Sequence, residues 1–298
     1  MTNSTTSSKA LDGFRRRIDE IDTAVHDCLI ERTGIVQQVA AEKYKAGMDT
    51  VIMRPGREAA ILRRLVARHE GEMPVATVAH IWREIISAML GIEGDLGVYV
   101  GCDGSATRQQ RLDLWDLARF HWGADTPIHL ADSVASAFVA AREKRDNIAV
   151  LPLPTKEDRA SWWQQLGSVD LESEHIWRCQ VIACLPFIQQ KDVPPKAQAL
   201  VIANVDREET GDDRTLVVMN DSVRASNIGS SDAIPGLDGF VMARDEKAGK
   251  ILLNIAGYLA DDDDRLKSLN DVQDPDGAAT VIGGYACPIM LDKDGDPS

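Results

Sequence analysis

Paired cysteines, aromatic side chains and long apolar runs are all scarce in this chain of 298 residues. The five cysteines form no CxxC pair, and their odd number fits reduced thiols better than a disulfide framework. The six histidines show no metal-ligand spacing, so we expect no metal site. No apolar run approaches the roughly 18 residues of a membrane span, and the polar N-terminus lacks the apolar core of a secretion signal. We therefore expect a cytoplasmic protein that does not associate with membranes.

Positive charge is also in short supply. The formal net charge of -14 at pH 7 disfavours a nucleic acid as a partner. Residues 1–95 hold 13 Lys and Arg against 14 Asp and Glu, whereas residues 96–298 hold 20 against 33. The acidity therefore belongs to the second part of the chain. With 44% hydrophobic residues, the chain is long enough to build two or three domains with a sizeable core.

Residues 11–45 have the pattern of one uninterrupted helix. Arg32 lies within its apolar seam, and Lys43 continues a parallel apolar line eleven residues later, on the same side of the helix. A buried cation needs an anion close by. Two interpretations stay open at this point, namely salt bridges to a neighbouring helix or a pocket for an anionic small molecule. The seam itself recurs at spacings of three and four residues and consists of Ile18, Ile21, Val25, Cys28, Ile35 and Val39.

The length of this helix predicts a partner. A helix of about 35 residues spans about 50 Å, whereas a compact unit of about 95 residues has a radius of gyration near 12 Å. Two shorter helices are predicted at residues 56–70 and 75–92, and they are too short to cover it. We therefore expect a second copy of the chain to cover the remainder, giving an intertwined helical homodimer.

After Gly94 the pattern changes to short apolar runs that alternate with helical stretches, which is typical of an α/β region. From residue 214 onward a βαββαβ-like order predicts a small ferredoxin-like sandwich. The expected strands are residues 97–100, 128–130, 148–153, 181–187, 199–205, 216–219, 240–243, 251–258 and 280–282, and the expected helices are residues 107–122, 132–144, 161–166 and 262–269.

The charged positions of the helical part combine into a specific pattern. Together they resemble, over residues 11–95, the all-helical (type II) chorismate mutases in the form fused to prephenate dehydratase. The resemblance implies an intertwined dimer of three-helix chains that converts chorismate to prephenate without a cofactor. The residues that carry it are LDGFRRRIDEID around Arg15, Arg32 in ERT, Lys43, the stretch Arg54-Pro55-Gly56-Arg57-Glu58, and WREIISAMLGIE, which ends at Glu93.

By this resemblance, three cations of the long helix bind the substrate. Arg32 of one chain and Arg15 of the other would each bind a carboxylate of chorismate with a forked guanidinium. Arg15 lies about 100° from Arg32 around the helix axis, so it points elsewhere, as a residue serving the other chain must. Lys43 would donate a hydrogen bond to the ether oxygen whose C–O bond breaks.

The resemblance also assigns roles to the second and third helices. Glu58 would accept a hydrogen bond from the ring hydroxyl, and Arg57 would add positive potential. Without the other residues, Arg57 and Glu58 also fit a solvent-facing pair at a helix start. Arg54 stands where some members are acidic, and Met89 lies near a position where some carry Ser. One carboxylate contact is therefore expected to be either missing or replaced by Arg54. Glu93 stands where other members carry Gln, and it donates to the ether oxygen only while protonated, so we expect activity to fall as pH rises.

The second part resembles the dehydratase and its terminal ACT domain, with the defining residues replaced. The Thr-Arg-Phe motif of the dehydratase would fall at residues 198–201, where the chain reads QALV. An ESRP-like segment of the ACT domain would fall at residues 242–245, MARD, which keeps only Arg244. The expected organisation is a disordered leader (1–10), a mutase domain (11–95), a degenerate dehydratase-like α/β domain (96–213), an ACT-like domain (214–292) and a tail (293–298).

The resemblance therefore predicts a chorismate mutase of phenylalanine and tyrosine biosynthesis with a non-catalytic C-terminal half. One alternative is a bifunctional enzyme that also dehydrates prephenate. Another is a non-enzymatic regulatory protein that presents its acidic half to a partner enzyme or binds an aromatic amino acid as effector.

Overall fold

The computed structural model describes residues 3–46, 52–155, 161–167, 179–221, 234, 237–267, 269, 279–293 and 295. Its contacts divide the chain into two compact units, Met1–Thr50 and Val51–Ser298. We call them the N-terminal unit and the main unit. The boundaries expected at residues 95/96 and 213/214 do not coincide with this division. Of the expected tail, only residues 293 and 295 are among the described residues.

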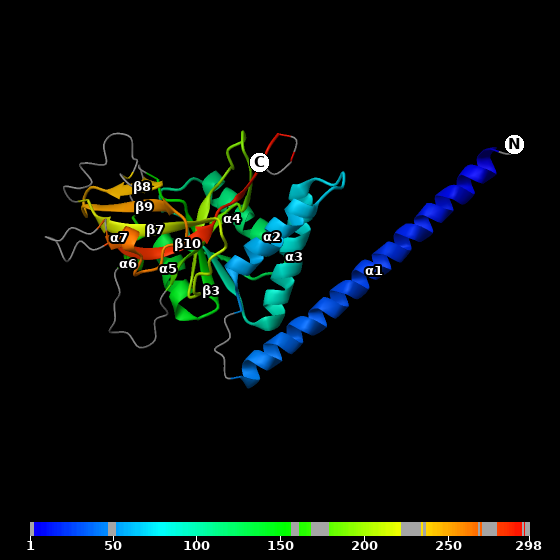
Figure 1. Cartoon of the computed structure of the whole chain (residues 1–298), viewed down its shortest axis with the longest axis horizontal. Helices are drawn as coiled ribbons and strands as arrows, with labels where there is room; N and C mark the ends of the chain where they lie inside the picture. The colour runs from blue at the N-terminus through cyan, green and yellow to red at the C-terminus, as the bar shows by residue number, and fades with distance from the viewer. Residues whose placement is uncertain are drawn as a thin grey trace. The chain divides into compact units, whose positions relative to one another are not determined.

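The described part of the N-terminal unit is a single helix, α1 (Asn3–Lys45), coloured blue in Figure 1. This confirms the long helix predicted from the sequence. It begins at Asn3 rather than at Leu11, so the disordered leader expected for residues 1–10 is helical from Asn3 onward. The apolar seam is open to solvent along its length, since Ile18 is 57% exposed, Val25 55% and Ile35 52%.

The main unit begins with two antiparallel helices, α2 (Pro55–Arg68) and α3 (Val75–Glu93), which lie side by side in Figure 1. Both confirm the predicted helices to within two residues. Pro55 occupies the first turn of α2, where its missing N–H costs no hydrogen bond. By length and composition alone α3 meets the criteria for a membrane span, with a hydropathy of 1.3; buried core helices meet them too.

Nine strands of the main unit form one continuous sheet, in the order β2-β1-β3-β6-β4-β10-β7-β9-β8. The pairs β2-β1, β1-β3 and β4-β10 are parallel, and the others are antiparallel. The strands are β1 (Gly97–Val100), β2 (Ile128–Leu130), β3 (Asn147–Pro152), β4 (Gln180–Leu185), β6 (Ala199–Ala203), β7 (Asp213–Asn220), β8 (Gly239–Asp245), β9 (Lys250–Ala256) and β10 (Thr280–Ala286).

The sheet joins the two regions that the sequence predicted as separate domains. Strand β10, from the region expected to be ACT-like, pairs with β4 at Gly283 and Val181. A Cβ atom at Gly283 would lie 2.3 Å from the backbone of Val181, and the φ of +134° is one that residues with a Cβ avoid. Only glycine therefore allows the two strands to approach this closely.

The remaining elements are short, apart from two helices. Strands β5 (Ile188–Gln190) and β11 (Ile289–Leu291) form a small parallel sheet that the sequence reading missed. The helices α4 (Arg108–Trp122) and α5 (Val134–Glu143) confirm the predicted ones, and α6 (Gln164–Gly167) and α7 (Asp264–Lys267) are single turns. A capping box of Thr107 and Gln110 fixes the start of α4. This helix ends beside α3, which places His121 against it.

Helices α2 and α3 share their hydrophobic cores with the sheet region. Ile86 and Leu90 of α3 belong to one buried cluster with Val98 and Val150 of the central strands. A second cluster joins α2 and α3 to β11 through Val66, Val75 and Leu291. The two helices are therefore packed into the main unit.

Candidate active site

The predicted cations of α1 differ in their exposure. Arg15 is exposed and forms a salt bridge to Asp12 one turn earlier, with 3.2 Å between Nη1 and Oδ1. Arg32 and Lys43 are half-buried. Their separation of eleven residues is close to three helical turns, so they lie on one side of α1 as predicted. An exposed pair such as Arg15 and Asp12 stabilises a helix by about 0.5 kcal/mol at most, which leaves Arg15 readily available for another anion.

The first turn of α2 places its two neighbouring charges in opposite environments. Arg57 is exposed, whereas Glu58 is only 8% exposed and sits on the buried face with Ala59 and Leu62. The alternative of a solvent-facing pair at a helix start is therefore wrong for Glu58. The backbone N–H of Glu58 donates to the carbonyl of Arg54 and closes the first turn.

Glu58 forms a buried ion pair with Arg83 of α3, which the sequence reading did not single out. Nη1 of Arg83 lies 2.9 Å from Oε2 of Glu58, and Arg83 is 5% exposed. Nε of Arg83 donates to the carbonyl oxygen of His121 at 3.1 Å, and Nη2 contacts the Nε2 atom of the same histidine. Three helices, α2, α3 and α4, thus each supply one member of a buried cluster.

The charges in this cluster depend on one another. Burial raises the pKa of the Glu58 carboxyl, and the neighbouring guanidinium of Arg83 opposes that rise. Burial, followed by repulsion from Arg83, holds the pKa of His121 well below its usual value. The imidazole is therefore neutral near pH 7. Since arginine only donates hydrogen bonds, Nε2 of His121 is the acceptor in their contact.

One oxygen of Glu58 is left without a partner. Oε1 is buried and accepts no hydrogen bond from any residue that the structure describes. A buried acceptor without a donor costs about 1–3 kcal/mol. Glu58, Arg83 and His121 line a hollow of about 440 Å³, open mouth included, whose other walls come partly from Met53 and Ile182. Glu58 thus combines a position in the wall of this hollow with a carboxylate oxygen that lacks a donor.

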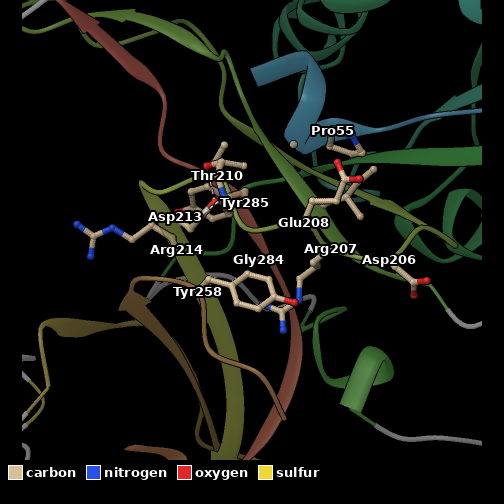
Figure 2. A pocket seen from close by; sticks show the side chains of 13 residues that line it. Pro55, Asp206, Arg207, Glu208, Thr210, Asp213, Arg214, Tyr258, Gly284 and Tyr285 are labelled. Carbon is tan, nitrogen blue, oxygen red and sulfur yellow. Dashed lines mark hydrogen bonds between the residues drawn. The ribbon is translucent and has the colours of Figure 1, made fainter. Parts of the chain in front are cut away.

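Arg54, predicted to bind substrate, is held by the acidic connector that precedes β7. Its Nε lies 2.9 Å from Oε1 of Glu208, although the arginine side chain stays 52% exposed. Figure 2 shows Glu208 beside Pro55, at the rim of a polar cleft in which Arg207 lies alongside the ring of Tyr258. The carboxylate that Arg54 contacts here is that of the protein's own Glu208, and its contact with a substrate carboxylate stays a prediction.

Arg63 forms a second link between α2 and the sheet region. Its Nη1 donates to Oγ1 of Thr210 at 2.8 Å, and its Nη2 donates to the carbonyl oxygens of Asp212 at 2.8 Å and Cys287 at 3.0 Å. These three groups, with Glu208, bind α2 to the connector and to the end of β10. The orientation of α2, and so of Glu58, is therefore set by the sheet region.

Glu93 is the last residue of α3 and is half-buried. The main unit thus contains Arg54, Arg57, Glu58 and Glu93, whereas Arg15, Arg32 and Lys43 belong to the N-terminal unit. Arg83 could have been found from the sequence, since it precedes the buried Ile86 by three residues and Leu90 by seven. A cation in that register is the same signal that identified Arg32.

Comparison with known proteins finds a family similar to one part of this chain. The family model of chorismate mutase type II matches residues 14–94. The helical part of the chain is similar to type II chorismate mutases. We call residues 14–94 the mutase segment; it includes most of α1 and all of α2, and it ends just after α3.

Three similar proteins carry the name bifunctional chorismate mutase/prephenate dehydratase. The one from Pseudomonas aeruginosa is 30% identical over 157 residues, which are 50% of this chain and 40% of that protein. Those from Stutzerimonas stutzeri and Aquifex aeolicus are 29% and 28% identical, over 50% and 48% of this chain and 40% and 38% of theirs. The chain therefore spans about 40% of the length of these curated relatives.

A solved structure of prephenate dehydratase from Streptococcus mutans covers 66% of this chain and 100% of its own, at 15% identity and a TM-score of 0.37.

Proposed function

We propose that the protein is a chorismate mutase, an isomerase that rearranges chorismate to prephenate in the biosynthesis of aromatic amino acids. The match of residues 14–94 to the type II family is the observation that carries the proposal. The observed helices α1, α2 and α3 support it, since six of the seven proposed site residues, all except Arg54, belong to them.

The proposed reaction is intramolecular, and it needs positioning and charge stabilisation in place of a nucleophile or a cofactor. Arg32 of one chain and Arg15 of the second chain each bind one of the two substrate carboxylates. Lys43 donates to the ether oxygen as its C–O bond breaks, and Glu58 accepts from the ring hydroxyl through its unpartnered Oε1.

Three further residues complete the proposed site. Arg57, which is exposed, contributes positive potential around the dianionic substrate. Arg54 binds a substrate carboxylate only if it releases Glu208. Glu93 donates to the ether oxygen in its protonated form.

The proposal includes a homodimer. The exposed seam of α1 supports it, because large apolar side chains repeated along a helix of 43 residues are costly to leave in water. A second α1 has the same pattern and can cover the seam, which also brings Arg15 of one chain to the site of the other.

The test is to follow the loss of chorismate absorbance with the purified full-length protein. Arg32→Ala should lower kcat/KM about 100-fold or more, since it removes a charged donor from the substrate, while circular dichroism shows unchanged helicity. Arg17→Ala is the matched control, because Arg17 is an exposed arginine of the same helix that pairs with Glu20. A folded wild-type dimer without turnover would contradict the proposal.

Glu93→Gln tests the proposed acid. The glutamine side chain donates a hydrogen bond without being protonated, so the variant should be at least as active as the wild type across the pH range. Identical pH profiles for the two proteins would remove Glu93 from the mechanism.

A second activity is suggested by the relatives, whose names include prephenate dehydratase. Strand β6, which begins within the predicted position of the catalytic motif, is apolar and fully buried from Ala199 to Ala203. Assaying phenylpyruvate formation from prephenate would decide this. Titration calorimetry with phenylalanine, tyrosine and tryptophan would test the proposed effector. The cytoplasmic location and a partner enzyme stay predictions.

A further inference from the structure

The cluster of Glu58, Arg83 and His121 connects the sheet region to the proposed mutase chemistry. We propose that Arg83 is a positioning residue, which, held by His121, fixes the carboxylate of Glu58 as the acceptor for the substrate's hydroxyl. This inference rests on the proposed function for the role of Glu58. It assigns to α4, which lies outside the mutase segment, a part in shaping the mutase site.

The geometry leaves Arg83 little freedom. All three of its guanidinium nitrogens have partners, namely Oε2 of Glu58 for Nη1 and the carbonyl and ring of His121 for Nε and Nη2. The fork thus bridges α2 and α4. Because one carboxylate oxygen is bound by Arg83, the other is held in a fixed direction, and it has no hydrogen-bond donor among the described residues.

The ionisation of Glu58 depends on this contact. A buried carboxyl prefers the neutral form, and a neutral carboxyl is a poorer acceptor for a hydroxyl. Arg83 opposes the effect of burial and so keeps the carboxylate charged. Removing the guanidinium therefore both frees the carboxyl to rotate and raises its pKa further.

The other titratable groups around the cluster cannot take over this role. Among the described residues that line the hollow, they are His121 and Cys184. His121 is neutral near pH 7 and Cys184 has a pKa raised to about 12 by burial, so neither supplies positive charge. His80, one turn before Arg83 on α3, lines a neighbouring cavity and pairs with Glu84 at 3.8 Å.

The position of His121 makes the sheet region part of the proposed site. Helix α4 packs on β1 and β3 as well as on α3, so its C-terminal end is held by the central sheet. The sheet therefore fixes the position of His121, which holds Arg83, and Arg83 in turn orients the carboxylate of Glu58. A purely structural salt bridge would stabilise the fold as well, but it would not set the pH dependence of chorismate turnover.

The experiment compares Arg83→Met, Arg83→Lys and the control Arg119→Met in the full-length protein. Arg119 is an exposed arginine of α4. Arg83→Met should lower kcat/KM about tenfold or more at pH 7 and move the acidic limb of its pH profile to higher pH, because Glu58 then protonates more readily. Arg83→Lys keeps the charge and should restore much of the profile with a reduced kcat. Arg119→Met should match the wild type.

A second measurement, the pH dependence of the unfolding free energy, tests the inference without an assay of chorismate turnover. In Arg83→Met the folded-state pKa of Glu58 is raised above its unfolded value. The associated stability is therefore present at acidic pH and lost as pH rises through the folded-state pKa. Denaturant unfolding from pH 4 to 8 should show this loss, and Glu58→Gln in the same background should remove it.

The outcomes separate the two proposals. Absence of turnover in the wild type would overturn the mutase function, while the unfolding series would still report on Arg83 and Glu58. An unfolding free energy of Arg83→Met that varies with pH as in the wild type would overturn the inference. If Arg83→Met does not fold, Arg83→Lys with wild-type kcat and pH profile would overturn it.

Discussion

Helix α1 and the pair α2–α3 belong to the same mutase segment, yet their apolar side chains differ in exposure to solvent. The seam of α1 stays about half exposed, as at Ile18 and Val25. The inward side chains of α2 and α3, such as Leu62 at 1% and Ile86 at 5%, are covered by the main unit of the same chain. In the proposed dimer a second chain covers the seam of α1, whereas the inward side chains of α2 and α3 are already covered by the sheet region.

The difference shows that the boundary of a sequence family is not always the boundary of a packed unit. The family match runs through the junction between residues 50 and 51. The proposed site residues are divided in the same way. Mutations on the two sides of this junction should therefore affect different properties, namely association on the α1 side and folding stability on the α2–α3 side.

Deleting residues 1–50 should have the largest effect. The shortened chain loses Arg32 and Lys43, so its mutase activity should fall below detection, and without the apolar seam it should be monomeric. It should still unfold cooperatively, because the cores of the main unit are intact. Light scattering would measure the oligomeric state, and thermal unfolding would measure the cooperativity. Non-cooperative unfolding would mean that α1 covers part of the main unit.

Leu62→Ala should lower the free energy of unfolding by about 2–5 kcal/mol, since it leaves a cavity under α2. Denaturant titration at two protein concentrations would measure this loss and show whether it depends on association. Ile81→Ala is the control, because Ile81 on α3 is 41% exposed. Equal losses in the two variants would contradict the burial of this face.

Val25→Asp should weaken the proposed dimer about 100-fold in Kd, or about 2.7 kcal/mol, because it places a charge in the apolar seam. Sedimentation equilibrium would report the change. Thr23→Asp, an exposed polar position outside the seam, should leave Kd unchanged within a factor of three or so. A dimer that tolerates both substitutions does not use this seam.

Arg54→Ala should have the smallest effect on folding. Its ion pair with Glu208 is half exposed, and such pairs contribute about 1 kcal/mol or less. If Arg54 also binds substrate, KM should rise while the unfolding free energy hardly changes. Glu208→Gln would release the arginine from its partner and should leave KM unchanged or lower it.

Much of the architecture was predictable from local patterns. The apolar spacing of residues 11–45 gave α1, Pro55 marked the start of α2, and the alternation after Gly94 gave β1, α4 and β3 to within about one residue. These features depend on neighbours in sequence. The pairing of β4 with β10 joins Val181 to Gly283, and no local pattern encodes so distant a contact.

The same distinction between local patterns and distant contacts applies to the candidate site. The sequence by itself determined which residue types are present and in which order, from Arg15 to Glu93, because helical periodicity and charge are local properties. Only the tertiary structure decided that Glu58 is buried against Arg83, that His121 holds Arg83, and that Arg54 pairs with Glu208. Those contacts bring together residues from separate elements, so they depend on how the helices pack on the sheet.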